Sequence, residues 1–148
     1  MIYKHLTNEA MKLAYKAHHG QVDKGGIPYI FHPYHLAEQM DDEYSTCAAL
    51  LHDVVEDTDI TLEQLRQIFP EPVIEAVATL THSKEEPYPD YVRRVCQNPI
   101  AKKVKLADLR HNSGLSRMDE ADEWALKRTA KYQKALAYLK RHRPVDPV

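Results

Sequence analysis

Apolar residues recur three or four positions apart along most of this chain, and that spacing constrains its fold more than any other feature. In the first helix that it predicts, one face carries Leu6, Ala10, Leu13, Ala14 and Ala17. No stretch alternates convincingly between apolar and polar residues, as a half-buried strand would. We therefore expect an all-α protein, a compact bundle of several helices.

Glycines, prolines and capping residues mark where these helices begin and end. Gly20 ends the first helix, and residues 21–31 are expected to form a loop with some extended character. The later helices are expected as one opened by His32-Pro33, one over Ser45–Asp57, a short one with the capping box Thr61-x-x-Gln64, one from Pro72 towards His82, and helices over Tyr88–Cys96, Asn98–Asn112 and Asp122–His142. Residues 83–90 should form a solvated loop and residues 144–148 a frayed tail.

Length and composition favour one ordinary globular unit. With 148 residues, a single domain over 1–148 is expected. The formal net charge of −2 gives no global attraction to nucleic acid or to a membrane surface, so neither is expected as a partner. The N-terminus lacks a signal-peptide pattern and no apolar run is long enough to span a bilayer, which makes a cytoplasmic location the expectation. The oligomeric state stays open, a homo-oligomer included.

The expected third helix carries a cluster of metal-ligating residue types. His52 and Glu56 lie four positions apart, as do Asp53 and Asp57, so a continuous helix would project all four side chains from one side. Three carboxylates beside apolar residues repel one another and resist burial. A divalent cation would relieve both costs, and imidazole together with carboxylate suits manganese, iron, zinc or magnesium.

A second, separate segment repeats this combination. Asp108 lies in the middle of an otherwise apolar helix, where a lone buried carboxylate needs a partner or a metal. Lys105 and Asn112 fall about one turn before and one turn after it. This spacing indicates a metal ligand flanked by donors that could orient a substrate.

Each residue also has a simpler interpretation when it is taken alone. His32 could be a loop histidine beside Pro33, and Asp108 could pair with Lys105 or Arg110. Glu56 and Asp57 could merely cap or solvate a helix end. What favours a metal site is the order of the residues along the chain: a histidine, then a His-Asp pair, then an aspartate.

Most of the remaining candidates have structural interpretations. His18 is expected to support the first helix or the site from behind its ligands, whereas His5, His35, His82 and His142 are expected at the surface. Tyr132 could stack on a base, but packing is the more frequent role of such a tyrosine. Cys47 is interpreted as a small buried apolar residue.

The ordered motifs resemble those of the HD superfamily, and more closely those of alarmone hydrolases. The resemblance rests on Ala17-His18-x-Gly20-Gln21, Pro28-Tyr29-x-x-His32-Pro33, His52-Asp53-Val54-Val55-Glu56-Asp57-Thr58 and Lys105-Leu106-Ala107-Asp108. These segments are similar to the hydrolase domain of RelA/SpoT-type enzymes and to small stand-alone alarmone hydrolases. The similarity runs from about Leu6 to Leu115 and, less clearly, to Leu139.

The resemblance implies a function and a role for each matching residue. It implies an HD-domain fold and a manganese ion, or another divalent metal, held by His32, His52, Asp53 and Asp108. It implies that Glu56 and Asp57 position and activate the attacking water, and that Lys24 and Asn112 contact the nucleotide. The implied reaction removes pyrophosphate from the 3′ position of ppGpp and pppGpp.

Two departures from the family pattern keep other functions open. Asp23-Lys24-Gly25-Gly26 stands where the alarmone hydrolases commonly have Arg-Lys-Ser-Gly, and Leu109-Arg110 has the usual Arg-Leu order exchanged. An acidic Asp23 should disfavour a highly anionic nucleotide unless its side chain points away. The alternatives are an HD phosphohydrolase acting on another nucleotide, a dinucleotide phosphate or a small phosphate ester, and a non-catalytic nucleotide-binding module.

Overall fold

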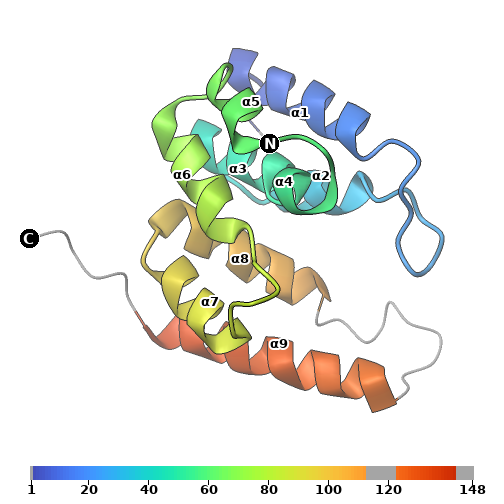
Figure 1. Cartoon of the computed structure of the whole chain (residues 1–148), viewed down its shortest axis with the longest axis vertical. Coiled ribbons are helices and arrows are strands. Elements are labelled where there is room, and N and C mark those ends of the chain that lie inside the picture. Colours follow the sequence, from blue (N-terminus) through green and yellow to red (C-terminus); the bar gives the residue numbers. More distant parts are fainter. Residues whose placement is uncertain (1, 113–122, 143–148) are drawn as a thin grey trace, which may run out of the picture.

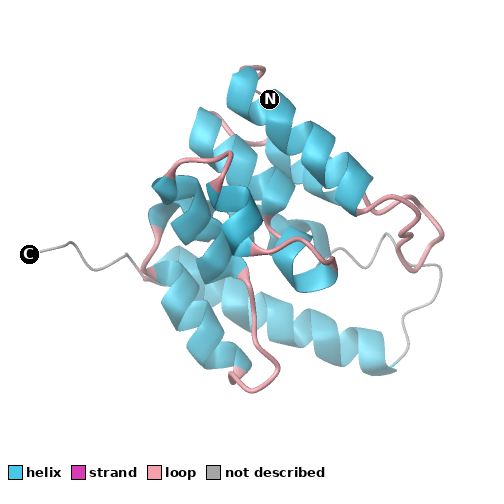
Figure 2. Ribbon diagram, turned by 45° about the horizontal axis from the view of Figure 1, so that its top comes forward, coloured by secondary structure: helices cyan, strands magenta, loops and turns pink. Residues whose placement is uncertain are grey.

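The computed structural model describes residues 2–112 and 123–142, and it contains helices and loops but no strand within those ranges (Figure 2). The helices are, in chain order, α1 (His5–Ala17), α2 (Phe31–Glu38), α3 (Glu43–Leu51), α4 (Val54–Asp57), α5 (Leu62–Arg66), α6 (Glu71–Leu80), α7 (Tyr88–Cys96), α8 (Pro99–Asn112) and α9 (Glu123–Arg141). The predicted all-α fold is confirmed. The expected frayed tail at 144–148 lies outside the described residues, and a single domain over 1–148 stays a prediction.

Local signals placed most helix ends well. The capping box of α5 is present, with Thr61 and Gln64 each bonding the other's backbone N–H. Asn98 accepts a hydrogen bond from the N–H of Ala101 at the start of α8, over 2.9 Å. The 21–31 loop has the expected extended character, in an isolated bridge between Val22 and Pro28.

The prediction of one helix over Ser45–Asp57 was wrong. The helix begins earlier, because the Asp42 side chain accepts the N–H of Ser45 over 2.8 Å. It stops at Leu51, and after a turn at His52 and Asp53 the chain resumes as α4. At the break, Nδ1 of His52 hydrogen-bonds to the carbonyl of Ala49 over 2.7 Å, the group that accepts the N–H of residue 53 in an unbroken helix.

Two helices, α3 and α8, form the centre of the bundle (Figure 1). α3 packs against α1, α2, α6 and α8, and α8 packs against α2, α3, α6, α7 and α9. α3 is buried almost all round, from Ser45 to Leu51. This packing brings the turn between α3 and α4 close to the middle of α8.

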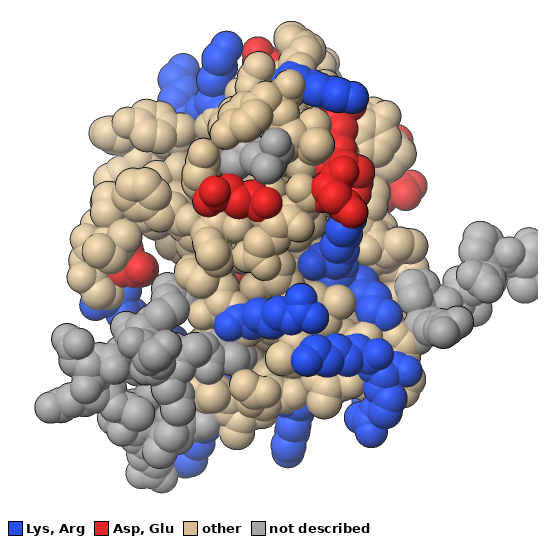
Figure 3. Space-filling view, turned by 180° about the vertical axis from the view of Figure 1, so that it is seen from behind, with Lys and Arg blue, Asp and Glu red and all other residues tan. Residues whose placement is uncertain are grey.

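Charged side chains are unevenly spread over the surface. On the back of the molecule, Lys and Arg gather mainly over the lower half, where α7, α8 and α9 lie in Figure 1 (Figure 3). Where acidic and basic groups meet on the surface, Lys103 of α8 contacts Asp41 and Asp42 before α3. Among residues 2–112 and 123–142, no helix has both the length and the apolar character needed to cross a membrane.

Candidate metal and phosphate site

The four residues expected to bind a metal come together from three parts of the fold. His32 comes from α2, His52 and Asp53 from the turn between α3 and α4, and Asp108 from α8. Nε2 of His32 lies 2.8 Å from Oδ1 of Asp108, and Nε2 of His52 lies 3.7 Å from the same oxygen and 3.1 Å from Oδ2 of Asp53. Ligand atoms of His32, His52 and Asp53 all lie within 4.8 Å of one another.

The hydrogen bonding and the pKa of His52 fit the role of a metal ligand. Its Nδ1 is committed to the Ala49 carbonyl, which leaves the Nε2 lone pair for a cation. Nε2 is buried and has no hydrogen-bond partner of acceptable geometry. Burial would lower the pKa of His52, but Asp53 and Asp108 outweigh it and hold this pKa well above its ordinary value. The site therefore favours a positive charge at Nε2, which a proton or a metal ion can supply.

Both aspartates are held in their ionised, metal-binding form. Burial raises the pKa of Asp53, but the neighbouring His52 brings it down to about 2. For Asp108, Lys105 and the two histidines overcome the cost of burial and keep its pKa well below the usual range. Deprotonated carboxylates are the form that coordinates a divalent metal.

The ligands are steadied by a set of surrounding residues. Asp108 accepts from Lys105 Nζ and from Asn112 Nδ2, each over 3.0 Å, so the predicted flanking donors do contact it. The pairing with Lys105, which was an alternative to metal binding, uses Oδ2, while Oδ1 faces the histidines. The two interpretations of Asp108 are thus compatible.

Sequence reasoning missed two contacts of this kind. The hydroxyl of Tyr29 donates a hydrogen bond to Oδ2 of Asp53. His111 places its Nδ1 2.7 Å from Nδ1 of His32, with the two rings stacked. His111 had a sequence signal, since it follows Asp108 by three residues on α8, the spacing of neighbours on a helix. Tyr29 lies in the turn before α2, and its contact with Asp53, 24 residues away, had no signal of this kind.

His18 supports the site from behind its ligands, as expected. It is buried, its Nδ1 lies 2.9 Å from Oε1 of Gln21, and its ring centroid is 4.8 Å from that of Tyr29. Nε2 of Gln21 in turn donates to the backbone carbonyl of Asp57 over 3.2 Å. The first helix and its following loop are thereby tied to α4, which follows the turn that carries His52 and Asp53.

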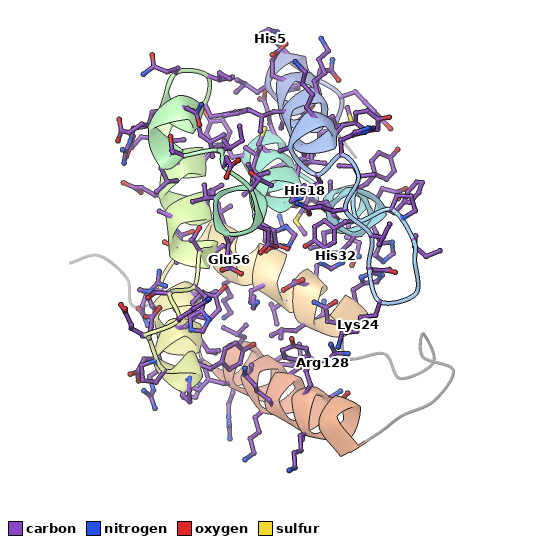
Figure 4. The ribbon with its side chains drawn as sticks, turned by 45° about the vertical axis from the view of Figure 1, so that its right-hand side comes forward. His5, His18, Lys24, His32, Glu56 and Arg128 are labelled. Atoms are coloured by element: carbon purple, nitrogen blue, oxygen red, sulfur yellow. The ribbon has the colours of Figure 1, made fainter. Side chains whose placement is uncertain are left out.

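Glu56 and Asp57 form a second acidic group that shares Asp53 with the histidine cluster. Carboxylate oxygens of Asp53, Glu56 and Asp57 lie within 4.8 Å of one another. Burial and the nearby charges of Asp53 and Glu56 raise the pKa of Asp57 to about 6. Oε1 of Glu56 accepts the backbone N–H of His82 over 2.7 Å, which fixes it at the mouth of the site. Figure 4 shows Glu56 and His32 on the same side of α8.

A cavity of about 170 Å³ opens beside these groups. It is lined by His52, Asp53, Glu56, Leu80, His82, Tyr88, Tyr91, Lys105, Asp108, Asn112, Lys131 and Tyr132. The carboxylates suit a cation, whereas Lys105 and Lys131 suit an anion bound next to it. His82, expected at the surface, is half-buried and lines this cavity, and Tyr132 faces the cavity rather than packing alone.

Lys24 lies apart from the other predicted site residues. It is exposed on the loop between α1 and α2 and is not among the residues that line the cavity (Figure 4). Beside it, Oδ1 of Asp23 accepts the N–H groups of Gly25 and Ile27 over 2.8 and 3.0 Å. Its carboxylate shapes this loop.

Comparisons with known proteins show what this chain is similar to. The HD domain family matches residues 10–112. The zebrafish (Danio rerio) protein guanosine-3′,5′-bis(diphosphate) 3′-pyrophosphohydrolase MESH1 is 33% identical over 137 residues, which cover 84% of this chain and 76% of that protein. The bifunctional (p)ppGpp synthase/hydrolase SpoT of Escherichia coli K12 is 34% identical over 119 residues, 70% of this chain.

A solved structure has a similar fold. It is described as a metazoan orthologue of SpoT that hydrolyses ppGpp, and it superposes with a TM-score of 0.76 at 25% identity over 98% of this chain and 90% of that one. Seven other curated relatives, SpoT among them, are much longer proteins, of which this chain spans between 8% and 17%.

Proposed function

The chain belongs to the HD domain family, and we propose that it is a metal-dependent phosphohydrolase that removes pyrophosphate from the 3′ position of ppGpp and pppGpp. One observation supports the proposal. His32 and the ionised Asp53 and Asp108 converge on His52, whose buried Nε2 has no hydrogen-bond partner, and a cavity with lysines on its wall opens beside them. The proposed substrate is taken from the names of MESH1 and SpoT, which contain guanosine-3′,5′-bis(diphosphate) and (p)ppGpp.

We assign manganese to His32, His52, Asp53 and Asp108. The mixture of imidazole and carboxylate suits a borderline divalent ion, so iron or zinc could replace it in the test tube. When bound, such an ion lowers the pKa of water and stabilises charge on phosphoryl oxygens. The protein's part is to keep both aspartates ionised and His52 in the tautomer that offers Nε2.

Glu56 and Asp57 are assigned to the attacking water. The carboxylate of Glu56 is held by the His82 N–H, so it can orient a water molecule without moving. The raised pKa of Asp57, about 6, suits a group that accepts a proton near neutral pH. Water adds to the phosphorus that is bonded to the 3′ oxygen, that bond breaks, and the products are pyrophosphate and a nucleotide with a free 3′ hydroxyl.

The substrate contacts are assigned to residues around and beyond the cavity. Asn112 and Lys105 touch Asp108 and reach the cavity, where they can meet the phosphates next to the metal. Lys24 lies farther out, so its assigned role is to meet a part of the nucleotide that extends past the cavity. Tyr132 offers an aromatic face on the cavity wall for the base.

A panel of phosphorylated substrates with manganese tests the proposal. We expect pyrophosphate from ppGpp with the wild-type chain and its loss in Asp53→Ala and Glu56→Gln. The second change keeps an oxygen for the His82 N–H but removes the charge. Turnover retained in both variants would refute the assigned roles. Release of single phosphates from a dinucleotide phosphate or a small ester, with ppGpp untouched, would favour the alternative that Asp23 leaves open.

A further inference from the structure

A second hollow of the described chain lies outside the candidate metal site. A groove of about 540 Å³ runs between α7 and α9, against about 170 Å³ for the cavity beside the metal ligands. It is lined by Tyr88, Pro89, Val92, Arg93, Lys127, Ala130, Lys131, Lys134, Ala135 and Tyr138. Its volume is in the range of sites that hold small organic molecules. Apart from Lys131, which also lines the cavity beside the metal ligands, no residue assigned to the metal, the water or the substrate lines it, so the proposed function leaves the groove unexplained.

The walls of this groove combine apolar surface with positive charge. Pro89, Val92, Ala130 and Ala135 make an apolar floor, with the rings of Tyr88 and Tyr138 beside it. All four charged residues in the lining are cationic, and none of the lining residues is acidic. Such walls fit a ligand with a flat apolar body and negative groups.

The spacing of the cations indicates more than one negative group. Lys127, Lys131 and Lys134 follow one another at helical intervals of four and three, so they share one face of α9 over about 10 Å. Arg93 of α7 faces them and is paired with Asp90 over 2.6 Å. Each lysine ammonium acts as a point charge that can pair with one phosphate group. A row of such groups about 10 Å long therefore matches a chain of phosphates better than a single carboxylate.

We propose that this groove is a second nucleotide site, which takes a nucleoside polyphosphate with its base on the apolar floor and its phosphates along the lysines of α9. The groove adjoins the cavity of the metal ligands, because Tyr88 and Lys131 line both. The ammonium of Lys131 lies 4.1 Å from the centre of the Tyr88 ring. Phosphates bound in the groove attract that ammonium away from the Tyr88 ring. Because Tyr88 and Lys131 also line the cavity of the metal ligands, a ligand in the second site changes the wall of that cavity.

Calorimetric titration with GTP, in EDTA so that no metal contributes, tests this inference without any reliance on catalysis. Two groove variants are compared with the wild type: Lys127→Glu/Lys134→Glu, which reverses the charge, and Ala130→Trp, which fills the floor. Lys12→Glu/Lys16→Glu on α1 is the matched control, since it makes the same change of net charge on exposed lysines far along the chain. Circular dichroism confirms that each variant is folded.

We expect GTP to bind at least tenfold more weakly to both groove variants and unchanged to the control. Inorganic tripolyphosphate should bind more weakly than GTP, because it cannot use the apolar floor. Four results would overturn the inference: no GTP binding to the wild type, an equal loss in the control, tripolyphosphate binding as tightly as GTP, or binding abolished by Tyr132→Ala but not by the groove variants. The last would place the nucleotide in the cavity of the metal ligands instead.

Discussion

At the scale of single residues, the candidate metal ligands depend on neighbours that set their tautomers. Nδ1 of His52 is held by a backbone carbonyl, which no side-chain substitution removes, whereas Nδ1 of His32 is held by the side chain of His111. For His32 to offer Nε2 to a metal, Nδ1 must carry the proton and Nδ1 of His111 must accept it. His111 is thus a positioning residue of the proposed site.

The prediction from His111 concerns metal affinity. His111→Phe keeps an aromatic ring beside His32 but removes the acceptor, so manganese should bind about 10- to 100-fold more weakly. His111→Asn retains an acceptor on a short side chain and should lose less. Titration calorimetry with manganese measures both, and wild-type affinity in the Phe variant would show that His111 merely packs there.

Asp23 gives a second prediction for a single residue. Its carboxylate accepts two N–H groups of its own loop, and that loop carries Lys24. Asp23→Asn keeps an acceptor oxygen while removing a negative charge near a polyanionic substrate, so the KM for ppGpp should fall. Asp23→Ala also loses the two hydrogen bonds and should raise KM. Steady-state kinetics of both variants measures their KM values for ppGpp. Equal KM values would mean that the loop hydrogen bonds do not shape substrate binding.

At the scale of the helices, the start of α3 depends on Asp42. Its side chain caps the helix at Ser45 and also accepts from Lys103 Nζ, over 2.8 Å in each case. Burial would raise the pKa of Asp42, but the bonds from Lys103 and Ser45 outweigh it and lower this pKa below 3.8. Asp42→Ala should reduce the free energy of unfolding by about 1 kcal/mol, and Asp42→Asn, which can still cap, by less.

The pH dependence of this effect has a definite sign. A carboxyl with a lowered folded pKa stabilises the protein above its unfolded pKa, here near 3.8, and loses that contribution as the pH falls through the folded value. The gap between wild type and Asp42→Asn should therefore be full at pH 6 and shrink below pH 3.8. Urea unfolding at a series of pH values measures it, and a gap that widened in acid would contradict the assignment.

Helix positions could largely be predicted from the sequence, because caps and periodicity act locally. Thr61, Gln64 and Asn98 signal helix starts within a few residues of themselves, and the structure has helices there. The break at His52 and Asp53 could not be predicted in this way, since apolar spacing continues through Leu51 and Val54. It depends on a ring-to-carbonyl hydrogen bond, and hence on where the packed fold places the imidazole.

For the site, residue types and their order identified the four candidate ligands, but not their neighbours. The contact between His32 and Asp108 joins positions 76 residues apart, and that between His32 and His111 joins positions 79 apart. Only the packing of α2 against α8 brings them together. The groove between α7 and α9 had no sequence signal for the same reason: its two walls are separate segments whose lysines, taken alone, resemble any solvated helix face.

At the scale of the whole molecule, a metal at the proposed site would join α2, the turn between α3 and α4, and α8. An ion that binds the folded chain and not the unfolded one stabilises it by about 2.7 kcal/mol at a concentration 100 times its Kd. Manganese should therefore raise the Tm of the wild type and have little effect on His52→Ala. Differential scanning calorimetry with and without EDTA checks this, and an equal rise in both proteins would place the metal elsewhere.

The most direct measurement is the number of manganese ions that each chain binds, by equilibrium dialysis, in the wild type and in single alanine variants of His32, His52, Asp53 and Asp108. Lys12→Met serves as a control, because Lys12 is an exposed residue of α1 that pairs with Glu9 rather than with an assigned ligand. We predict one tightly bound ion per wild-type chain, strong weakening in all four ligand variants, and retained binding in the control. Undiminished binding in the Asp53 and Asp108 variants would contradict the proposed metal site and the reaction built on it.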